Sequence, residues 1–138
     1  IDALEVDASQ LGRIVVKGTA KNKEATIAVA AERFNLNADA LIALARGADV
    51  LVHEAMWLPG IDRIVAREPN ATTLRKHLLE SHTVAEDCGR VAEAAGVKTL
   101  VLSHFVPGDG SIPDDLWRNA AKQHFRGEVI IGHDLMEL

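Results

Sequence analysis

Polar side chains that could do chemistry follow two apolar segments of the sequence. His53 and Glu54 end one such segment, and His104 ends the next one along the chain. A third histidine, His82, lies between two segments with helical patterning. Functional groups in an open α/β sheet collect beyond the carboxyl ends of the strands, where loops vary freely on a rigid support. These positions are therefore candidates for a functional site.

Imidazole and carboxylate groups together are typical of a metal centre. Imidazole binds zinc, manganese or iron, a carboxylate can bridge two such ions, and metal-bound water becomes a nucleophile near neutral pH. A single histidine at a strand end more often bonds a nearby carbonyl or carboxylate. His77, His124 and His133 lie in charged or helical surroundings, which favour a structural role. No compact motif such as His-Glu-x-x-His occurs, so spacing alone predicts an α/β domain with a candidate metal site.

Alternating strand and helix patterns surround these residues. Two apolar runs predict a hairpin of strands before residue 31, and later runs predict strands at 49–54, 97–103 and 128–132. Helical periodicity predicts helices from residue 37 to Gly47, at 72–80, between Thr83 and Gly96, and after Pro113. Pro59 and Gly60 predict a turn, and Thr83 with Glu86 predicts a capping box. This order is typical of an α/β layer protein.

Composition limits the classes of protein that fit. The 138 residues are 48% hydrophobic and 25% charged, which is the mixture of one globular domain. A net charge of −5 argues against an extended basic groove for nucleic acid, so there is no strong nucleic-acid signal. No segment has the length of a membrane span or the layout of a signal peptide, which predicts a cytoplasmic protein. The single cysteine, Cys88, excludes an internal disulfide and a thiolate zinc cluster.

Three segments resemble the second half of the metallo-β-lactamase superfamily. They are Leu44–Ala55, Ser81–Thr83 with Asp87–Ala92, and Ala95–Phe105, and they occur in the family's order. Within the superfamily they are most similar to the ribonuclease Z-like and arylsulfatase-like hydrolases. The resemblance covers about residues 32–138. It implies an α/β fold that is the C-terminal half of an αβ/βα sandwich, with one sheet and helices on one face, and a site for two metal ions, usually zinc.

The resemblance also implies roles for individual residues. His104 matches the last metal-ligand histidine of the family. His82 matches the histidine that contacts the scissile group and can donate a proton to the leaving oxygen. Glu54 matches a carboxylate that orients that histidine, and His53 is expected to be structural.

Two departures from the family pattern bear on metal binding. The family carries Ser-Gly-Asp-Thr before its first helix, with the Asp bridging both metals, and here Glu32 is the expected counterpart. The first-half signature His-x-His-x-Asp-His, which supplies most of the ligands, does not occur in these residues. Since catalytic zinc needs about three protein ligands, the chain by itself is expected to bind metal weakly.

The leading hypothesis is therefore a single domain, residues 1–138, that forms part of a metal-dependent hydrolase. Its substrate would be a small-molecule ester, sulfate ester or lactone, or a phosphodiester, with zinc and alternatively manganese or iron as the cofactor. Half of a sandwich leaves one apolar sheet face without a cover, so a missing N-terminal half or a homodimer partner is expected to pack there. The absence of an initial methionine also suggests a fragment.

Two alternatives remain open at this point. The chain could be a catalytically silent α/β module that binds a partner, which the departures at Glu32 and the absent signature favour. Nucleotide binding on a doubly wound sheet is weaker, because no glycine-rich phosphate loop follows a predicted strand.

Overall fold

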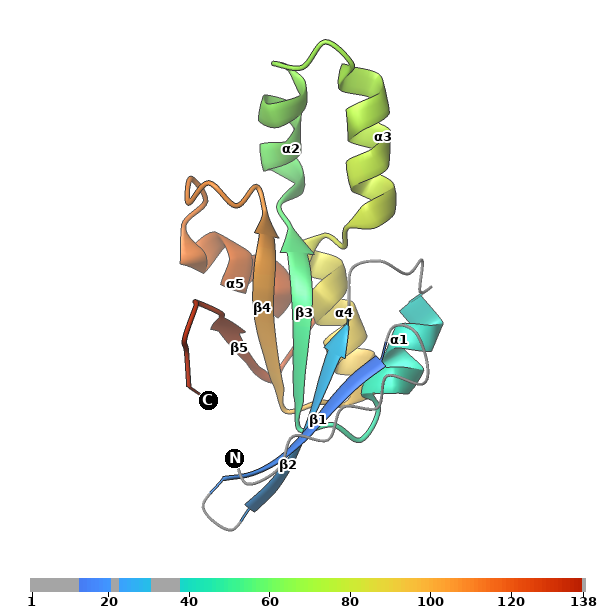
Figure 1. Cartoon of the computed structure of the whole chain (residues 1–138), viewed down its shortest axis with the longest axis vertical. Coiled ribbons are helices and arrows are strands. Elements are labelled where there is room, and N and C mark those ends of the chain that lie inside the picture. Colours follow the sequence, from blue (N-terminus) through green and yellow to red (C-terminus); the bar gives the residue numbers. More distant parts are fainter. Residues whose placement is uncertain (1–12, 21–22, 31–37, 138) are drawn as a thin grey trace.

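The computed structural model describes residues 13–20, 23–30 and 38–137 (Figure 1). The elements of these residues follow one another as β1 (Arg13–Ala20), β2 (Lys23–Ala30), α1 (Ala38–Ala45), β3 (Val50–Met56), α2 (Leu58–Val65), α3 (Ala71–Ser81), α4 (Ala85–Ala95), β4 (Thr99–Val106), α5 (Asp114–Lys122) and β5 (Glu128–Ile131). The predicted alternation of strands and helices is confirmed.

The strands form one mixed sheet in the order β1-β2-β3-β4-β5. β1 and β2 are the predicted antiparallel hairpin, and β2, β3, β4 and β5 are parallel to one another. Parallel strands present their carboxyl ends at a single edge, which in Figure 1 lies below the α2–α3 pair. The segments that follow β3 and β4 are therefore brought together, as the strand-end rule requires.

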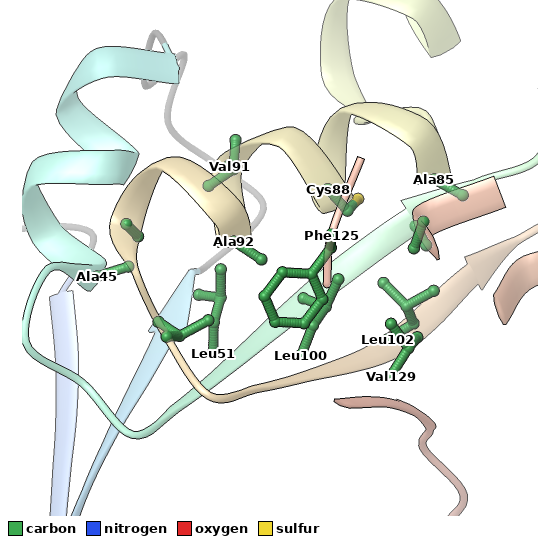
Figure 2. Close-up of a cluster of buried hydrophobic side chains, with 14 of the residues drawn as sticks. Ala45, Leu51, Ala85, Cys88, Val91, Ala92, Leu100, Leu102, Phe125 and Val129 are labelled. Carbon is green, nitrogen blue, oxygen red and sulfur yellow. The ribbon is translucent and has the colours of Figure 1, made fainter. Parts of the chain in front are cut away.

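Helices α1, α4 and α5 form one layer, in which α4 contacts both of the others. Side chains on one face of the sheet alternate with those on the other, and one set packs against these helices (Figure 2). The fully buried members of this core include Leu51 on β3 and Leu100 and Leu102 on β4. Their burial against the helix layer is the main apolar stabilisation of the described fold.

The α4–α5 crossing depends on the small size of Gly89. A Cβ atom at this position would lie 2.2 Å from the carbonyl oxygen of Ala121 on α5. The two helices consequently approach backbone to backbone at this point, and only glycine allows that separation.

Residues 58–81 form a helical hairpin, where the sequence predicted a turn at Pro59 and Gly60 followed by a helix. The turn prediction is wrong, because Pro59 lies in the first turn of α2, where its missing N–H is not needed. Buried Ile61 and Val65 of α2 pack with Met56 and with half-buried residues of α3. The expected second helix is confirmed as α3, residues 71–81.

The start of α4 also differs from its prediction. The helix begins after Val84, with no side-chain cap, and the backbone N–H of Thr83 donates to the Glu54 carboxylate. The predicted capping box between Thr83 and Glu86 is therefore wrong, since a carboxylate from a distant strand occupies the amide. The predicted helix end at Gly96 is confirmed, with φ of 72°.

The predictions for α1 and α5 can also be compared with the structure. The stop near Gly47 is confirmed by its φ of 83°, whereas the predicted start at residue 37 lies outside the described residues. α5 follows Pro113 as predicted, and Trp117 is buried on it. Leu116, the residue before it, is 39% exposed because the helix turns it toward solvent.

Candidate active site

Glu54 and His82 form a hydrogen-bonded pair at the carboxyl edge of the sheet. Glu54 Oε2 lies 3.1 Å from His82 Nδ1, and Glu54 Oε1 accepts the Thr83 N–H at 2.6 Å. Glu54 is buried and His82 is partly buried. An imidazole that donates through Nδ1 to a carboxylate has its ring orientation set, and its reactivity is directed to Nε2.

The backbone between α3 and α4 is tied to β3 beside this pair. Met56 N–H donates to the Thr83 carbonyl oxygen at 2.8 Å, and Met56 pairs with Val84 in an isolated parallel bridge. His82 ends α3 in an extended conformation, with ψ of 153°. The last turn of α3 and the end of β3 therefore place His82 next to Glu54, although 28 residues separate them in sequence.

His104 occupies a β-bulge in β4. Ser103 pairs with Glu54 and Phe105 pairs with Ala55, so His104 is the extra residue on its strand. Its φ is +43°, in the left-handed region that non-glycine residues rarely adopt. A bulge redirects a side chain next to a functional site, and here the imidazole is exposed. The sequence predicted that the strand ends before His104, but β4 continues to Val106.

The bulge brings the two predicted histidines together. The rings of His82 and His104 stack with their centroids 5.9 Å apart and an interplanar angle of 25°. Glu54, His82 and His104 thus meet at one edge, from β3, from the α3–α4 connection and from β4. Glu32, the remaining predicted site residue, lies outside the described residues.

His53 lies on the helix-covered side of β3 and not in this site. Its Nδ1 lies 2.6 Å from the Glu54 carbonyl oxygen, to which the Cys88 thiol also donates at 3.2 Å. Burial lowers the pKa of His53 and raises the pKa of the Cys88 thiol well above its ordinary value. Both groups are therefore neutral near pH 7, and the predicted structural role of His53 agrees with this geometry.

An open hollow of about 580 Å³ lies beside His104. Its walls include Val52 and Val101 from the sheet face that α4 and α5 do not cover, together with His133 and Asp134 after β5. His133 was expected to have a structural role, and Asp134 was not among the predicted site residues. The strand-end signal that selected His104 applies to them as well, because β4 and β5 are parallel neighbours.

The described residues supply too few ligands for a catalytic metal ion. Within 13–20, 23–30 and 38–137, no group of three or more His, Cys, Asp or Glu side chains is placed to hold one. The exposed imidazole of His104 fits one position of a zinc ligand set, and about three are needed. The remaining ligands would have to come from other residues.

Comparison with known proteins places this arrangement in a family. The chain is 35% identical over 97 residues to a ribonuclease Z of Mycobacterium tuberculosis, a match that covers 70% of this chain and 33% of that protein. It is 38% identical over 96 residues to a ribonuclease Z of Streptomyces avermitilis, covering 70% and 28%. The chain belongs to the metallo-β-lactamase superfamily. It is ribonuclease Z-like, and it spans about a third of the length of these relatives.

Solved structures support the same fold. A metallo-β-lactamase fold protein of Bacillus subtilis, YhfI, aligns with a TM-score of 0.56 at 24% identity, over 86% of this chain and 40% of that one. A diphosphatase of the PhnP family aligns with a TM-score of 0.50 at 15% identity, over 94% and 44%. No family model matches the sequence. The predicted fold, part of a metallo-β-lactamase sandwich, is confirmed.

Among the helices of the described residues, none has both the length and the apolar composition needed to cross a membrane.

Proposed function

We propose that this chain is the C-terminal half of a metal-dependent hydrolase that cleaves phosphodiester bonds in RNA. The observation that carries the proposal is the meeting of Glu54, His82 and His104 at one exposed edge of the sheet. Its ribonuclease Z relatives favour RNA among the substrates considered. They do not favour the alternative of a catalytically silent module. The composition carried no nucleic-acid signal, so the substrate class comes from these relatives.

In this proposal His82 is the general acid. Its Nδ1 is held by the Glu54 carboxylate, so Nε2 is the atom that delivers a proton to the departing ribose oxygen. An alkoxide is a poor leaving group, and a proton donor in reach of it typically contributes about 10²–10⁴ in rate. Glu54 sets the direction of the ring and stabilises the imidazolium that precedes proton transfer.

His104 is proposed as one ligand of the metal centre, with zinc the expected ion and two ions the expected number. When bound, the metal would supply a hydroxide nucleophile and stabilise negative charge on the phosphate. The β-bulge contributes by turning the His104 imidazole out of the strand toward the edge. Glu32 is proposed as a bridging ligand from the segment that precedes α1.

The remaining ligands are proposed to come from an N-terminal half of the same polypeptide, with a second copy of the chain as the other source. The relatives are about three times longer than the matched region, which leaves room for such a half. Among the described residues, half-buried Val52 and buried Val101 lie on the sheet face away from α4 and α5 and line the hollow beside His104. A second sheet packed about 10 Å away would cover it and close the site.

The leaving group provides the test of the general acid. In the complete enzyme, His82→Ala is expected to lower kcat about 10²–10⁴-fold on a short RNA. The same variant should hydrolyse bis(p-nitrophenyl) phosphate at nearly the wild-type rate, because p-nitrophenolate leaves without a proton. Glu54→Gln should lower the RNA rate about 10–100-fold. His77→Ala on exposed α3 is the control and should change neither rate.

Two results would contradict the proposal. Equal losses on both substrates would show that His82 does not act as the acid. Hydrolysis that survives removal of divalent metal by a chelator, and is not restored or increased by zinc or manganese, would remove the metal from the reaction.

A further inference from the structure

A second hollow adjoins the one beside His104. It encloses about 340 Å³, within the range of about 300–1,000 Å³ that small-ligand sites occupy. We call it the side pocket. Its walls include Phe105, Ile112, Asp114, Trp117, His133 and Asp134.

The side pocket is continuous with the candidate active site. Phe105, His133 and Asp134 line both hollows. Phe105 directly follows His104, the proposed metal ligand, along β4. A substrate group bound in the side pocket would therefore lie close to the bond that the active site would cleave.

Phe105 is the partly exposed aromatic ring in the wall of the side pocket, and Trp117 behind it is only 3% exposed. Phe105 and Trp117 contact each other with their centroids 4.8 Å apart, and Trp57 packs edge-on to Trp117 at 5.9 Å. Trp57 N–H donates to the Val106 carbonyl oxygen at 2.8 Å, which joins the start of α2 to the end of β4. These contacts hold the half-buried Phe105 ring in place, and an aromatic ring with an accessible face stacks on nucleobases.

Carboxylates form the rim. Asp114 begins α5, Asp134 follows β5, and His133 Nε2 lies 3.5 Å from Asp114 Oδ2. The nearby loop adds Asp109, which accepts the Ser111 N–H at 3.0 Å. Ser111 in turn accepts a hydrogen bond from Arg63 on α2 at 2.9 Å.

The charges on this rim are mainly negative. Asp114 and Asp134 line the side pocket itself, whereas Arg63 reaches it only through Ser111 outside the wall. Hydrogen bonds from the Ser111 side chain and backbone N–H lower the pKa of Asp109, so that carboxyl is ionised at neutral pH. An anion near the rim is repelled, and a donor N–H group is accepted.

We propose that the side pocket binds an uncharged ring with N–H donors, the nucleobase next to the scissile phosphate, and excludes a second phosphate group. The inference rests on the proposed phosphodiesterase function and names the part of the substrate that this pocket selects. The Phe105 ring stacks on the base, and the carboxylates of Asp114 and Asp134 accept its N–H groups.

The test compares three kinds of p-nitrophenyl ester in the complete enzyme. They are methyl p-nitrophenyl phosphate, the 3′- and 5′-(p-nitrophenyl phosphate) esters of thymidine, and the same thymidine esters with a phosphate on the other hydroxyl. At least one thymidine ester should exceed the methyl ester in kcat/KM by about tenfold or more. The added phosphate should remove most of this gain.

The rim carboxylates are tested by charge removal. The double variant Asp114→Asn with Asp134→Asn should reduce the penalty of the added phosphate about tenfold, since each removes a repulsive charge. Asp115→Asn is the matched control, because Asp115 lies in the same first turn of α5 without lining the side pocket. Turnover of the methyl ester reports that each variant is folded. If the double variant no longer hydrolyses the methyl ester, the single variant Asp134→Asn replaces it in the test.

Three outcomes separate the inference from the proposed function. Equal turnover of thymidine and methyl esters, or an equal effect of Asp115→Asn, would overturn the inference while the phosphodiesterase stands. Failure to hydrolyse any of the esters with metal present would instead refute the proposed function. Calorimetric titration then compares ligands that each carry a phosphate for the proposed metal centre: thymidine 3′- or 5′-phosphate should bind more tightly than thymidine 3′,5′-bisphosphate. Tighter binding of the bisphosphate than of both monophosphates would overturn the inference.

Discussion

The two faces of the sheet have opposite characters, and neighbouring residues on β3 show it. His53 is buried with Cys88 against α4, where the pKa of its imidazole is lowered by burial. Glu54, the next residue, faces His82 at the exposed edge. The helix-covered face is a packed core, and half-buried Val52 on the other face lines the hollow beside His104. Two consecutive residues of β3 thus belong to different parts of the molecule, His53 to the packed core and Glu54 to the candidate active site.

The largest expected effect compares a leucine of the covered face with a valine of the open face. Leu100→Ala should lower the free energy of unfolding by about 2–5 kcal/mol, because Leu100 is fully buried. Val52→Ala should cost under about 1 kcal/mol, since Val52 is half-buried. Urea denaturation of the 138-residue chain measures both. Equal costs would mean that the open face is covered in solution, as in a homodimer.

The helix layer itself can be tested at its closest contact. Gly89→Ala should lower the free energy of unfolding by about 1–3 kcal/mol, because the added Cβ would overlap the Ala121 carbonyl oxygen. Gly110 has a positive φ, so Gly110→Ala is not a matched control. Ala94→Gly, on the exposed side of α4, is the control and measures helix propensity alone. The denaturation midpoints of the two variants measure the two effects. A neutral Gly89→Ala would show that α4 and α5 are farther apart than described.

The covered face also predicts a dependence of stability on pH. The pKa of His53 is lower in the folded chain than its ordinary value near 6.5. As pH falls below about 6.5, the unfolded chain binds a proton that the folded chain does not. Folding stability is therefore present above that pH and is lost on acidification, by at most about 1.4 kcal/mol per pH unit for one group.

Substitution of His53 isolates this contribution. His53→Asn keeps a donor near the Nδ1 position and should flatten the stability profile between pH 7 and 5. His77→Asn, on exposed α3, should leave the profile unchanged. An unaltered slope in His53→Asn would mean that other groups govern the acid response.

The smallest expected effect concerns the strained residue of the open edge. His104→Gly should raise the free energy of unfolding by about 1 kcal/mol, because its φ of +43° costs a non-glycine residue energy. It should also abolish metal-dependent hydrolysis in the complete enzyme. Leu135→Gly, at φ of +63° and fully exposed, is the control that should gain stability without losing activity. A destabilised His104→Gly would show that the imidazole contacts outweigh the strain.

Local signals predicted the fold well where one residue type has one strong preference. Gly96 adopts the positive φ that ends α4, and Pro113 precedes α5. The predictions were wrong where distant residues intervened. Glu54 accepts the hydrogen bond from the Thr83 N–H that the capping box required. Packing of buried Ile61 stabilises the helix that contains Pro59 and Gly60. A sequence window contains neither partner, so local pattern could not anticipate them.

The residues of the candidate site were also predicted only in part. The strand-end rule and the family resemblance selected Glu54, His82 and His104, and the structure brings these three together. His133 and Asp134 obey the same rule. His133 was expected to be structural because of its charged or helical surroundings, and Asp134 was not singled out. The role of each residue in metal binding and proton transfer stays a prediction.

Apart from α2, the sequence by itself determined the type of each element, the α/β class and the strand ends that carry polar groups, because these depend on local periodicity and on turn chemistry. Only the tertiary structure decided that β4 bulges at His104, that the His82 and His104 rings stack, and that an aromatic pocket opens beside them. Those features depend on strand register and on contacts between residues far apart in the chain, which no local preference encodes.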